Sequence, residues 1–286
     1  ALSTLQALLA DATRSRYSAD LLLNYGNEIV GAVSKPGSAN RAALQTALDA
    51  SLERLAGDSG LSVADQLGAV QARVSLALLD VKGSKPLAPS LTPEMVRLVQ
   101  AAVAQADQRS LDRYERQSVI PSAAHLLSQA GLLDASDALL QAELPQAISP
   151  YYHMLVLSSN AKLRGDRKSA LQWSEQAYAN AVGPATRLQW GSSHVLRLID
   201  LAPSEVARIE AAAAQVIAEL DPRADTFFER NRRSLEKMVK RLALWGQQPG
   251  HAPVVQKLRA QLDGVCAGLP PADAARPACQ AIFAKS

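Results

Sequence analysis

Aromatic side chains are scarce in this chain: Phe, Trp and Tyr together make up 4% of its 286 residues. Stretches in which apolar and polar residues alternate, as a half-buried β-sheet requires, are absent as well. The hydrophobic residues, 48% of the chain, are mostly Ala and Leu, which lose little side-chain freedom in a helix. The composition therefore predicts an all-α protein, long enough for one large or two modest domains.

Strong charge and long apolar runs are also missing. The formal net charge is +3, which is too small to indicate a nucleic-acid partner. No apolar run approaches the ~18 residues that a membrane-spanning helix needs, so we expect no membrane span. No signal peptide is visible after Ala1 and the chain lacks an initiator Met, from which we expect a processed or truncated product.

The sequence contains no recognisable catalytic or metal-binding motif. Its four histidines are not spaced as HxxxH or HExxH, and no cysteine lies near them: they are His125, His153, His194 and His251. There is no GxSxG, no SxxK with its accompanying loops, and no glycine-rich phosphate loop. Ser192, Ser193 and His194 are adjacent, but consecutive residues on a helix point in different directions. We therefore predict no catalytic residue, no metal site and no cofactor.

A period of 34 residues is present in the middle of the chain. Gly131 and Gly165 are 34 residues apart, and so are Pro150 and Pro184. Between the two prolines lie two helix-length segments, joined by a turn at Gly165 and rich in small residues. This period and this composition are typical of tetratricopeptide-type helical hairpins.

We therefore expect an all-α, right-handed array of helical hairpins, an α-solenoid resembling tetratricopeptide repeats, over residues 89–286. A separate N-terminal helical layer is expected over residues 1–88, because the segment GSKPLAPS (83–90) has the composition of a linker. The array is predicted to begin near Pro121, with a first helix over residues 122–130. Each hairpin can hide its apolar face only against its neighbours, so a terminal cap is expected where stacking stops.

The two cysteines, Cys266 and Cys279, flank the turn-rich stretch GLPPADAARP between two short helical segments. Two antiparallel helices joined in this way can bring the sulfurs together, and we predict a disulfide that staples the C-terminal cap. Closing such a loop contributes roughly 3 kcal/mol. A cysteine pair with no spare thiol favours an oxidising compartment. The alternative is two separately buried thiols in a cytosolic protein. The spacing is not CxxC, so no catalytic redox role is expected.

The segment GPATRLQWG is the least repeat-like part of the chain, and it places Arg187, Gln189 and Trp190 at the start of a helix. One interpretation is a recognition patch in which Trp190 and Arg187 bind a partner. The alternative is a structural junction, with Trp190 packed between hairpins and Arg187 capping a neighbouring helix. The same two interpretations apply to Tyr151 and Tyr152, which are likewise candidates for partner binding.

The densest basic stretch is ERNRR, at residues 229–233, with three further basic residues after it. On a helix four of these side chains fall along one side: Arg233, Lys237, Lys240 and Arg241. This side could bind an acidic partner. The alternative is a solvated face paired with Glu229 and Glu236. No aromatic residues alternate with the basic ones, as stacking on nucleic-acid bases would need.

Three stretches carry a resemblance: SPYYHMLVLSSNAKLRGD, ALQWSEQAYANAVGPATRLQWG and DGVCAGLPPADAARPAC. Over residues 120–285 the chain resembles the tetratricopeptide-like helical C-terminal region of bacterial exported thioredoxin-family proteins. In that family a thioredoxin domain with a WCxxC active site precedes the helical region. This chain has no WCxxC and no βαβ stretch, so the redox residues of the family map onto nothing here. The resemblance implies a periplasmic or secreted setting.

These observations predict a non-catalytic scaffold that binds a protein or peptide, associated with thiol–disulfide chemistry in the cell envelope. A thioredoxin-like domain is one candidate partner, and no nucleic acid is expected. Two alternatives stay open. One is an α-solenoid enzyme whose site is assembled from distant helices, around a carboxylate with a raised pKa. The other is a structural assembly subunit.

Overall fold

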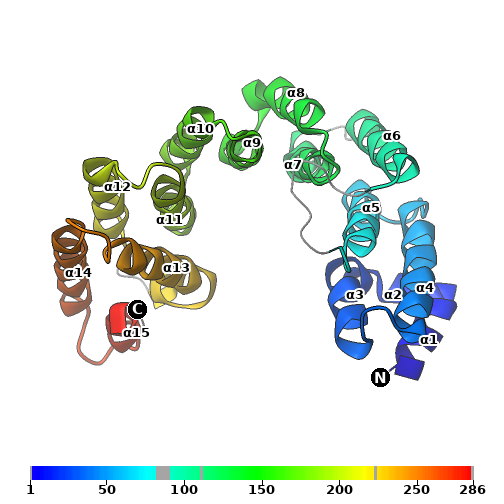
Figure 1. The fold of residues 1–286 in the computed structure, drawn as a ribbon, viewed down its shortest axis with the longest axis horizontal. Coiled ribbons are helices and arrows are strands. Elements are labelled where there is room, and N and C mark those ends of the chain that lie inside the picture. The colour runs from blue at the N-terminus through cyan, green and yellow to red at the C-terminus, as the bar shows by residue number, and fades with distance from the viewer. Residues whose placement is uncertain (1, 82–90, 110–111, 222–223, 285–286) are drawn as a thin grey trace. The chain divides into compact units, whose positions relative to one another are not determined.

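A computed structural model describes residues 2–81, 91–109, 112–221 and 224–284 (Figure 1). These residues form fifteen α-helices and two short 3-10 helices, and no strand occurs among them. The all-α prediction is therefore confirmed. No helix in these ranges is both long enough and apolar enough to cross a lipid bilayer.

The chain forms two compact units, Ala1–Ile148 and Ser149–Ser286. The helices of the first unit are α1 (Leu2–Ala10), α2 (Ala12–Tyr17), α3 (Ala19–Val33), α4 (Ala39–Ala56), α5 (Val63–Ala77), α6 (Pro93–Arg109), α7 (Arg113–Gln129), α8 (Leu133–Glu143) and η1 (Leu144–Gln146). The helices of the second unit are α9 (Pro150–Arg164), α10 (Arg167–Asn180), α11 (Pro184–Leu201), α12 (Val206–Ala218), η2 (Ala224–Phe227), α13 (Glu229–Trp245), α14 (Ala252–Ala267) and α15 (Ala275–Ala284).

The predicted linker, residues 83–90, and the domain boundary at residue 88 fall in a segment outside the described residues. The helices on either side of that segment, α5 and α6, contact each other and belong to the same unit. The division between the two compact units lies instead after Ile148. The helices before that segment, α1 to α5, thus belong to one unit with α6, α7 and α8.

Helix starts in the first unit follow from capping side chains. The hydroxyl of Ser38 accepts a hydrogen bond from the N–H of Arg41 at the start of α4. Ser62 does the same for Asp65 at the start of α5. Such caps satisfy backbone donors that the first turn of a helix leaves unpaired. Apolar residues at helical spacing on α4 are then buried against α3 and α5: they are Leu44, Leu48, Leu52 and Leu55.

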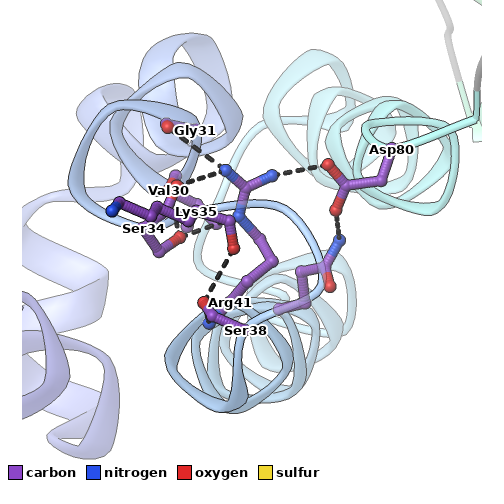
Figure 2. A network of polar contacts seen from close by, with 8 residues as sticks. Val30, Gly31, Ser34, Lys35, Ser38, Arg41 and Asp80 are labelled. Carbon is purple, nitrogen blue, oxygen red and sulfur yellow. Dashed lines mark hydrogen bonds and ion pairs between the residues drawn. The ribbon is translucent and has the colours of Figure 1, made fainter.

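A buried arginine ties three of these helices together (Figure 2). Arg41 is 4% exposed, and its guanidinium group pairs with Asp80 at 2.6 Å, just beyond the end of α5. It also donates to the hydroxyl and carbonyl oxygens of Ser34 and to the carbonyl of Gly31, at the end of α3. A buried charge is tolerated when it is paired and hydrogen-bonded in this way. Arg41 is therefore a structural residue of the first unit.

The first predicted hairpin begins earlier than expected. The prediction of a helix over residues 122–130 after Pro121 was wrong, because α7 begins at Arg113 and contains Pro121 in its interior. The side chain of Asp112 accepts hydrogen bonds from two N–H groups of the first turn and so starts the helix there. Val119 and Ile120, both fully buried, hold this part of the helix against the core. Capping and burial outweigh the hydrogen bond that proline removes.

The residues of the 34-residue period have equivalent structural roles. Gly131 and Gly165 both have φ = +79°, a conformation that glycine adopts without a steric penalty. In each turn the residue after the glycine donates its N–H to the carbonyl five residues earlier, as Asp166 does to Ala161. This is the Schellman arrangement that ends a helix. Pro150 and Pro184 are the first residues of α9 and α11.

In each of these hairpins a serine hydroxyl on one helix donates to an alanine carbonyl on the other, and the two hairpins exchange the positions of donor and acceptor. Between α7 and α8, the hydroxyl of Ser136 donates to the carbonyl of Ala124 at 2.8 Å. Between α9 and α10, the hydroxyl of Ser158 donates to the carbonyl of Ala170 at 2.7 Å. Positions 124 and 158 are equivalent in the period, as are 136 and 170. All four residues are fully buried, so small side chains here allow the helices to approach closely.

In the second unit, α9 runs parallel to α11, and α12 runs parallel to α14, each pair in a fixed register. Three of the contacts between α9 and α11 pair residues that are 38 apart: Tyr152 with Trp190, Ser159 with Arg197, and Lys162 with Asp200. A constant offset over this length requires two parallel helices. The same holds for α12 and α14, where Glu210 pairs with Lys257 and Ala214 with Gln261, both 47 apart. Packing contacts also join α11 to α13 and α13 to α15.

A single apolar core extends through the second unit from Leu171 on α10 to Phe283 on α15. Its last part contains the predicted disulfide, which joins Cys266 on α14 to Cys279 on α15 across a separation of 13 residues. Both cysteines are buried, and α15 contacts α13, α14 and η2. The cystine therefore fixes α15 to α14, and packing holds α15 against α13 and η2.

Candidate functional site

Three of the predicted partner-binding residues form one aromatic cluster. Tyr151 and Tyr152 lie in the first turn of α9, and Trp190 lies in the second turn of α11. The Trp190 ring meets that of Tyr152 edge to face at 5.4 Å between centroids and that of Tyr151 at 6.2 Å. Tyr151 is buried, whereas Tyr152 is 43% exposed. Tyr151 thus anchors the cluster in the unit, and Tyr152 presents it to solvent.

The indole N–H of Trp190 is enclosed and has no hydrogen-bond partner among the residues that the structure describes. Leaving such a donor unsatisfied costs about 1–3 kcal/mol. The cluster is therefore not optimised for stability alone. Buried polar groups that lack a hydrogen-bond partner are found mainly at functional sites.

A pair of side-chain amides joins α11, next to Trp190 in the sequence, to α13. Gln189, which precedes Trp190, donates through Nε2 to Oδ1 of Asn231 at 2.7 Å. Asn231 is buried and in turn donates to the carbonyl of Asp225. The Oε1 atom of Gln189 has no partner in the described part of the chain. This oxygen is an available acceptor on the residue that precedes Trp190.

An open groove of about 580 Å³ lies along this amide pair, between the start of α11 and the start of α13. Its lining residues are Ala185, Gln189, Asp225, Phe228, Glu229, Arg230 and Asn231. Glu229 has φ = +46°, an uncommon conformation for a residue with a side chain. Strained backbone of this kind is concentrated at functional sites. We call the cluster and the groove together the α9–α11–α13 surface, formed by Tyr151, Tyr152, Gln189, Trp190, Asn231 and the groove lining.

Arg187, the fifth predicted partner-binding residue, lies against other helices. Its guanidinium group makes a two-fold ion pair with Glu219, at 2.7 and 2.9 Å. It also donates to the carbonyls of Tyr178 and Ala181 at the end of α10 and lies over the Tyr178 ring. Burial acts to raise the pKa of Glu219, but hydrogen bonds from Arg187 and its other neighbours outweigh it and lower the pKa. Arg187 is thus engaged with α10 and the end of α12, whereas Trp190 contacts α9.

A second, smaller cavity of about 260 Å³ lies among α10, α11 and α12, and His194 lines it. His194 is 4% exposed, and its Nδ1 atom is 2.8 Å from the hydroxyl of Ser174. Burial lowers the pKa of His194, the charge of Glu175 opposes this and the charge of Arg208 adds to it, and the resulting pKa is about 4. The imidazole is therefore neutral at pH 7.

Ser174 and His194 are in contact, but they are not arranged as a catalytic nucleophile and its general base. The Ser174 hydroxyl is 2% exposed and donates to the carbonyl of Leu171. Ser193, adjacent to His194 in sequence, donates instead to the carbonyl of Gln189. For a reaction, the carbonyl carbon of a substrate must come within about 3–3.5 Å of the attacking oxygen. Burial of the Ser174 hydroxyl prevents this approach. Within the described ranges, no group of His, Cys, Asp and Glu residues is placed to hold a metal ion.

Sequence reasoning singled out Tyr151, Tyr152 and Trp190, but it paired Trp190 with Arg187 and did not predict that the three aromatic rings meet, nor that Asn231 on α13 pairs with Gln189. Asn231, Asp225 and Phe228 carry no motif, and their role depends on the packing of α13 against α11. The constant 38-residue offset between α9 and α11 was not visible as a sequence repeat either. Comparisons with protein-family models, curated proteins and solved structures find no match to this chain.

Proposed function

We propose that this protein is a non-catalytic scaffold that binds a peptide or an extended protein segment on the α9–α11–α13 surface. The observation that carries this proposal is the meeting of Tyr152 and Trp190 from two parallel helices, beside an open groove. Parallel next-but-one helices in a fixed register are the packing expected of a right-handed hairpin array. In such an array the first helices of successive hairpins line one continuous face.

The chemistry of the surface suits an extended segment. Tyr152 and Trp190 supply large, rigid contact area, and aromatic anchors of this kind carry a large share of the energy at interfaces. The free Oε1 atom of Gln189 can accept a hydrogen bond from a backbone N–H of the segment. An extended partner loses conformational freedom when it binds, so we expect modest affinity.

The disulfide and the sequence resemblance support a setting in the cell envelope. A buried cystine in a chain without spare cysteines fits a periplasmic or secreted protein. The resemblance to exported thioredoxin-family proteins makes a thioredoxin-like domain a candidate partner. Neither feature gives this chain a redox activity of its own.

Selection of random short peptides displayed on phage against the immobilised full chain tests the proposal. Peptides that share an aromatic or aliphatic position are expected, and their affinity is then measured by fluorescence anisotropy. Tyr152→Ala should weaken binding about tenfold or more, because it removes the exposed part of the anchor. Tyr25→Ala, which removes a tyrosine of similar exposure in the first unit, should leave binding unchanged.

Two results would overturn the proposal. One is the absence of any enriched peptide. The other is equal affinity of the Tyr152→Ala variant and the wild type. If light scattering instead shows self-association that Tyr152→Ala abolishes, the surface is an assembly interface, and the alternative of a structural subunit replaces the scaffold.

A further inference from the structure

Four basic side chains form an exposed stripe along α13, which we call the α13 stripe: Arg230, Arg233, Lys237 and Lys240. Their spacing of three, four and three residues places them within one narrow sector of the helix surface. The stripe begins in the groove, because Arg230 lines it. It is about 15 Å long, at 1.5 Å per residue.

The α13 stripe is not neutralised by the chain itself. None of its four cations has a carboxylate partner in the part of the chain that the structure describes. The carboxylate of Glu236 pairs with Arg232, which lies outside the stripe. Arg241, the next basic residue on the helix, pairs with Asp200 on α11. The sequence interpretation in which Glu229 and Glu236 neutralise this face therefore does not hold for these four residues.

Elsewhere in the second unit, arginines find partners on other helices. Arg208 pairs with Glu175, and Arg187 pairs with Glu219. A set of adjacent unpaired cations repels itself, and this repulsion is relieved when an anionic partner binds. The contrast makes the α13 stripe the best candidate on the second unit for attraction of opposite charge.

We propose that the α13 stripe binds the acidic part of an extended polypeptide whose apolar part lies on Tyr152 and Trp190. This proposal rests on the proposed function and names its partner class. A stripe of about 15 Å matches roughly five residues of extended chain. The partner is thus a short segment in which several Asp or Glu residues flank an aromatic or aliphatic anchor.

A polypeptide fits this surface better than a nucleic acid or a lipid membrane. The groove at the start of the stripe also contains the carboxylates of Asp225 and Glu229, which would repel a continuous phosphate backbone. No aromatic side chain interleaves with the four cations, as base stacking would require. Only Leu244 adds an exposed apolar side chain at the far end of α13, which is too little for insertion into a bilayer.

The test compares two variants of the full chain with the same change in net charge. The stripe variant carries Arg230→Gln, Arg233→Gln, Lys237→Gln and Lys240→Gln. The control variant carries Arg167→Gln, Lys168→Gln, Lys257→Gln and Arg259→Gln, four exposed residues on α10 and α14. Each protein is used to select random displayed peptides. Selected acidic peptides, matched peptides with Gln in place of their acids, and an oligodeoxythymidine are then titrated by fluorescence anisotropy.

Peptides selected on the wild type and on the control variant should contain Asp and Glu beside an apolar residue. Peptides selected on the stripe variant should retain only the apolar residue. The stripe variant should bind the acidic peptide about tenfold or more weakly, with a smaller dependence on salt. Enrichment of apolar residues without acids, or equal loss in the control variant, would overturn this proposal and leave the proposed function standing. Tighter binding of the oligonucleotide than of the acidic peptide would also overturn it. No enriched peptide at all would overturn the proposed function itself.

Discussion

Tyr152 and Trp190 contact each other edge to face although 38 residues separate them in the sequence. The same offset relates Ser159 to Arg197, so the contact is part of a register that continues along two parallel helices. Because both helices belong to rigid, packed hairpins, the aromatic pair is held in place before any partner arrives. Preorganisation of this kind lowers the entropic cost of binding.

Gly191 allows α11 to pack closely against α10 and α12. A Cβ atom at this position would lie 2.6 Å from Cγ2 of Val216 on α12 and 2.9 Å from the Tyr178 ring on α10. We predict that Gly191→Ala lowers the free energy of unfolding by about 1–3 kcal/mol, because three helices must move apart. Urea denaturation, followed by the fluorescence of the three tryptophans, measures the change. All three, Trp173, Trp190 and Trp245, belong to the second unit.

Gly264→Ala is the matched control. Gly264 lies within α14, and nothing is within 4 Å of the position that its Cβ would occupy. The substitution should raise the free energy of unfolding by about 0.5–1 kcal/mol, through helix propensity alone. Similar effects of the two substitutions would show that helix packing around Gly191 is looser than described.

The disulfide between Cys266 and Cys279 should stabilise the second unit. Replacing both cysteines by Ala removes a cross-link over 13 residues and is expected to cost about 3 kcal/mol. The urea midpoint reported by tryptophan fluorescence should therefore fall. The first unit contains neither cysteine, so its own unfolding transition should keep the same midpoint in the double variant. An unchanged fluorescence midpoint would mean that the cystine has no stabilising role.

His194 should make stability fall with acidification. Burial lowers the pKa of His194 to about 4 from the ordinary value of 6.5. Between these two values the unfolded chain takes up a proton that the folded protein excludes. The free energy of unfolding is therefore highest above pH 6.5, falls as the pH drops towards 4, and has lost up to about 3 kcal/mol when it levels off.

The His194→Asn variant isolates this effect, because its amide can keep a hydrogen bond to Ser174 but does not titrate. Urea midpoints of both proteins should be measured between pH 7 and pH 4. The difference in stability between wild type and variant is expected to shrink as the pH falls. Parallel curves would mean that the imidazole is exposed to water in the folded protein.

Sequence patterns reveal those parts of the fold that depend on local chemistry. Gly131 and Gly165 mark equivalent turns, because only a residue that tolerates positive φ ends a helix in this way. The cysteine spacing likewise indicated the disulfide that the structure contains. The start of α7 was misjudged at Pro121, because burial of that helix against its neighbours outweighs the local preference of proline.

The candidate site could be predicted only in part, for the same reason. Tyr152 and Trp190 stand out in an aromatic-poor sequence, so composition alone draws attention to them. Arg187 lies three residues from Trp190 and was grouped with it, yet it pairs with Glu219, 32 residues further along. Asn231 carries no sequence signal, since its role follows from the packing of α13 on α11. A single sequence does not show which distant residues will contact each other in the fold.

Amide hydrogen exchange of the full chain, with and without a peptide selected on it, tests most directly whether the α9–α11–α13 surface is the binding site. Binding should slow exchange at the starts of α9 and α11, around Tyr152 and Trp190, and along the first turns of α13. The first unit should exchange at the same rate in both samples. Protection confined to the first unit, or to the α10–α12 side of the second, would contradict the assignment of this surface.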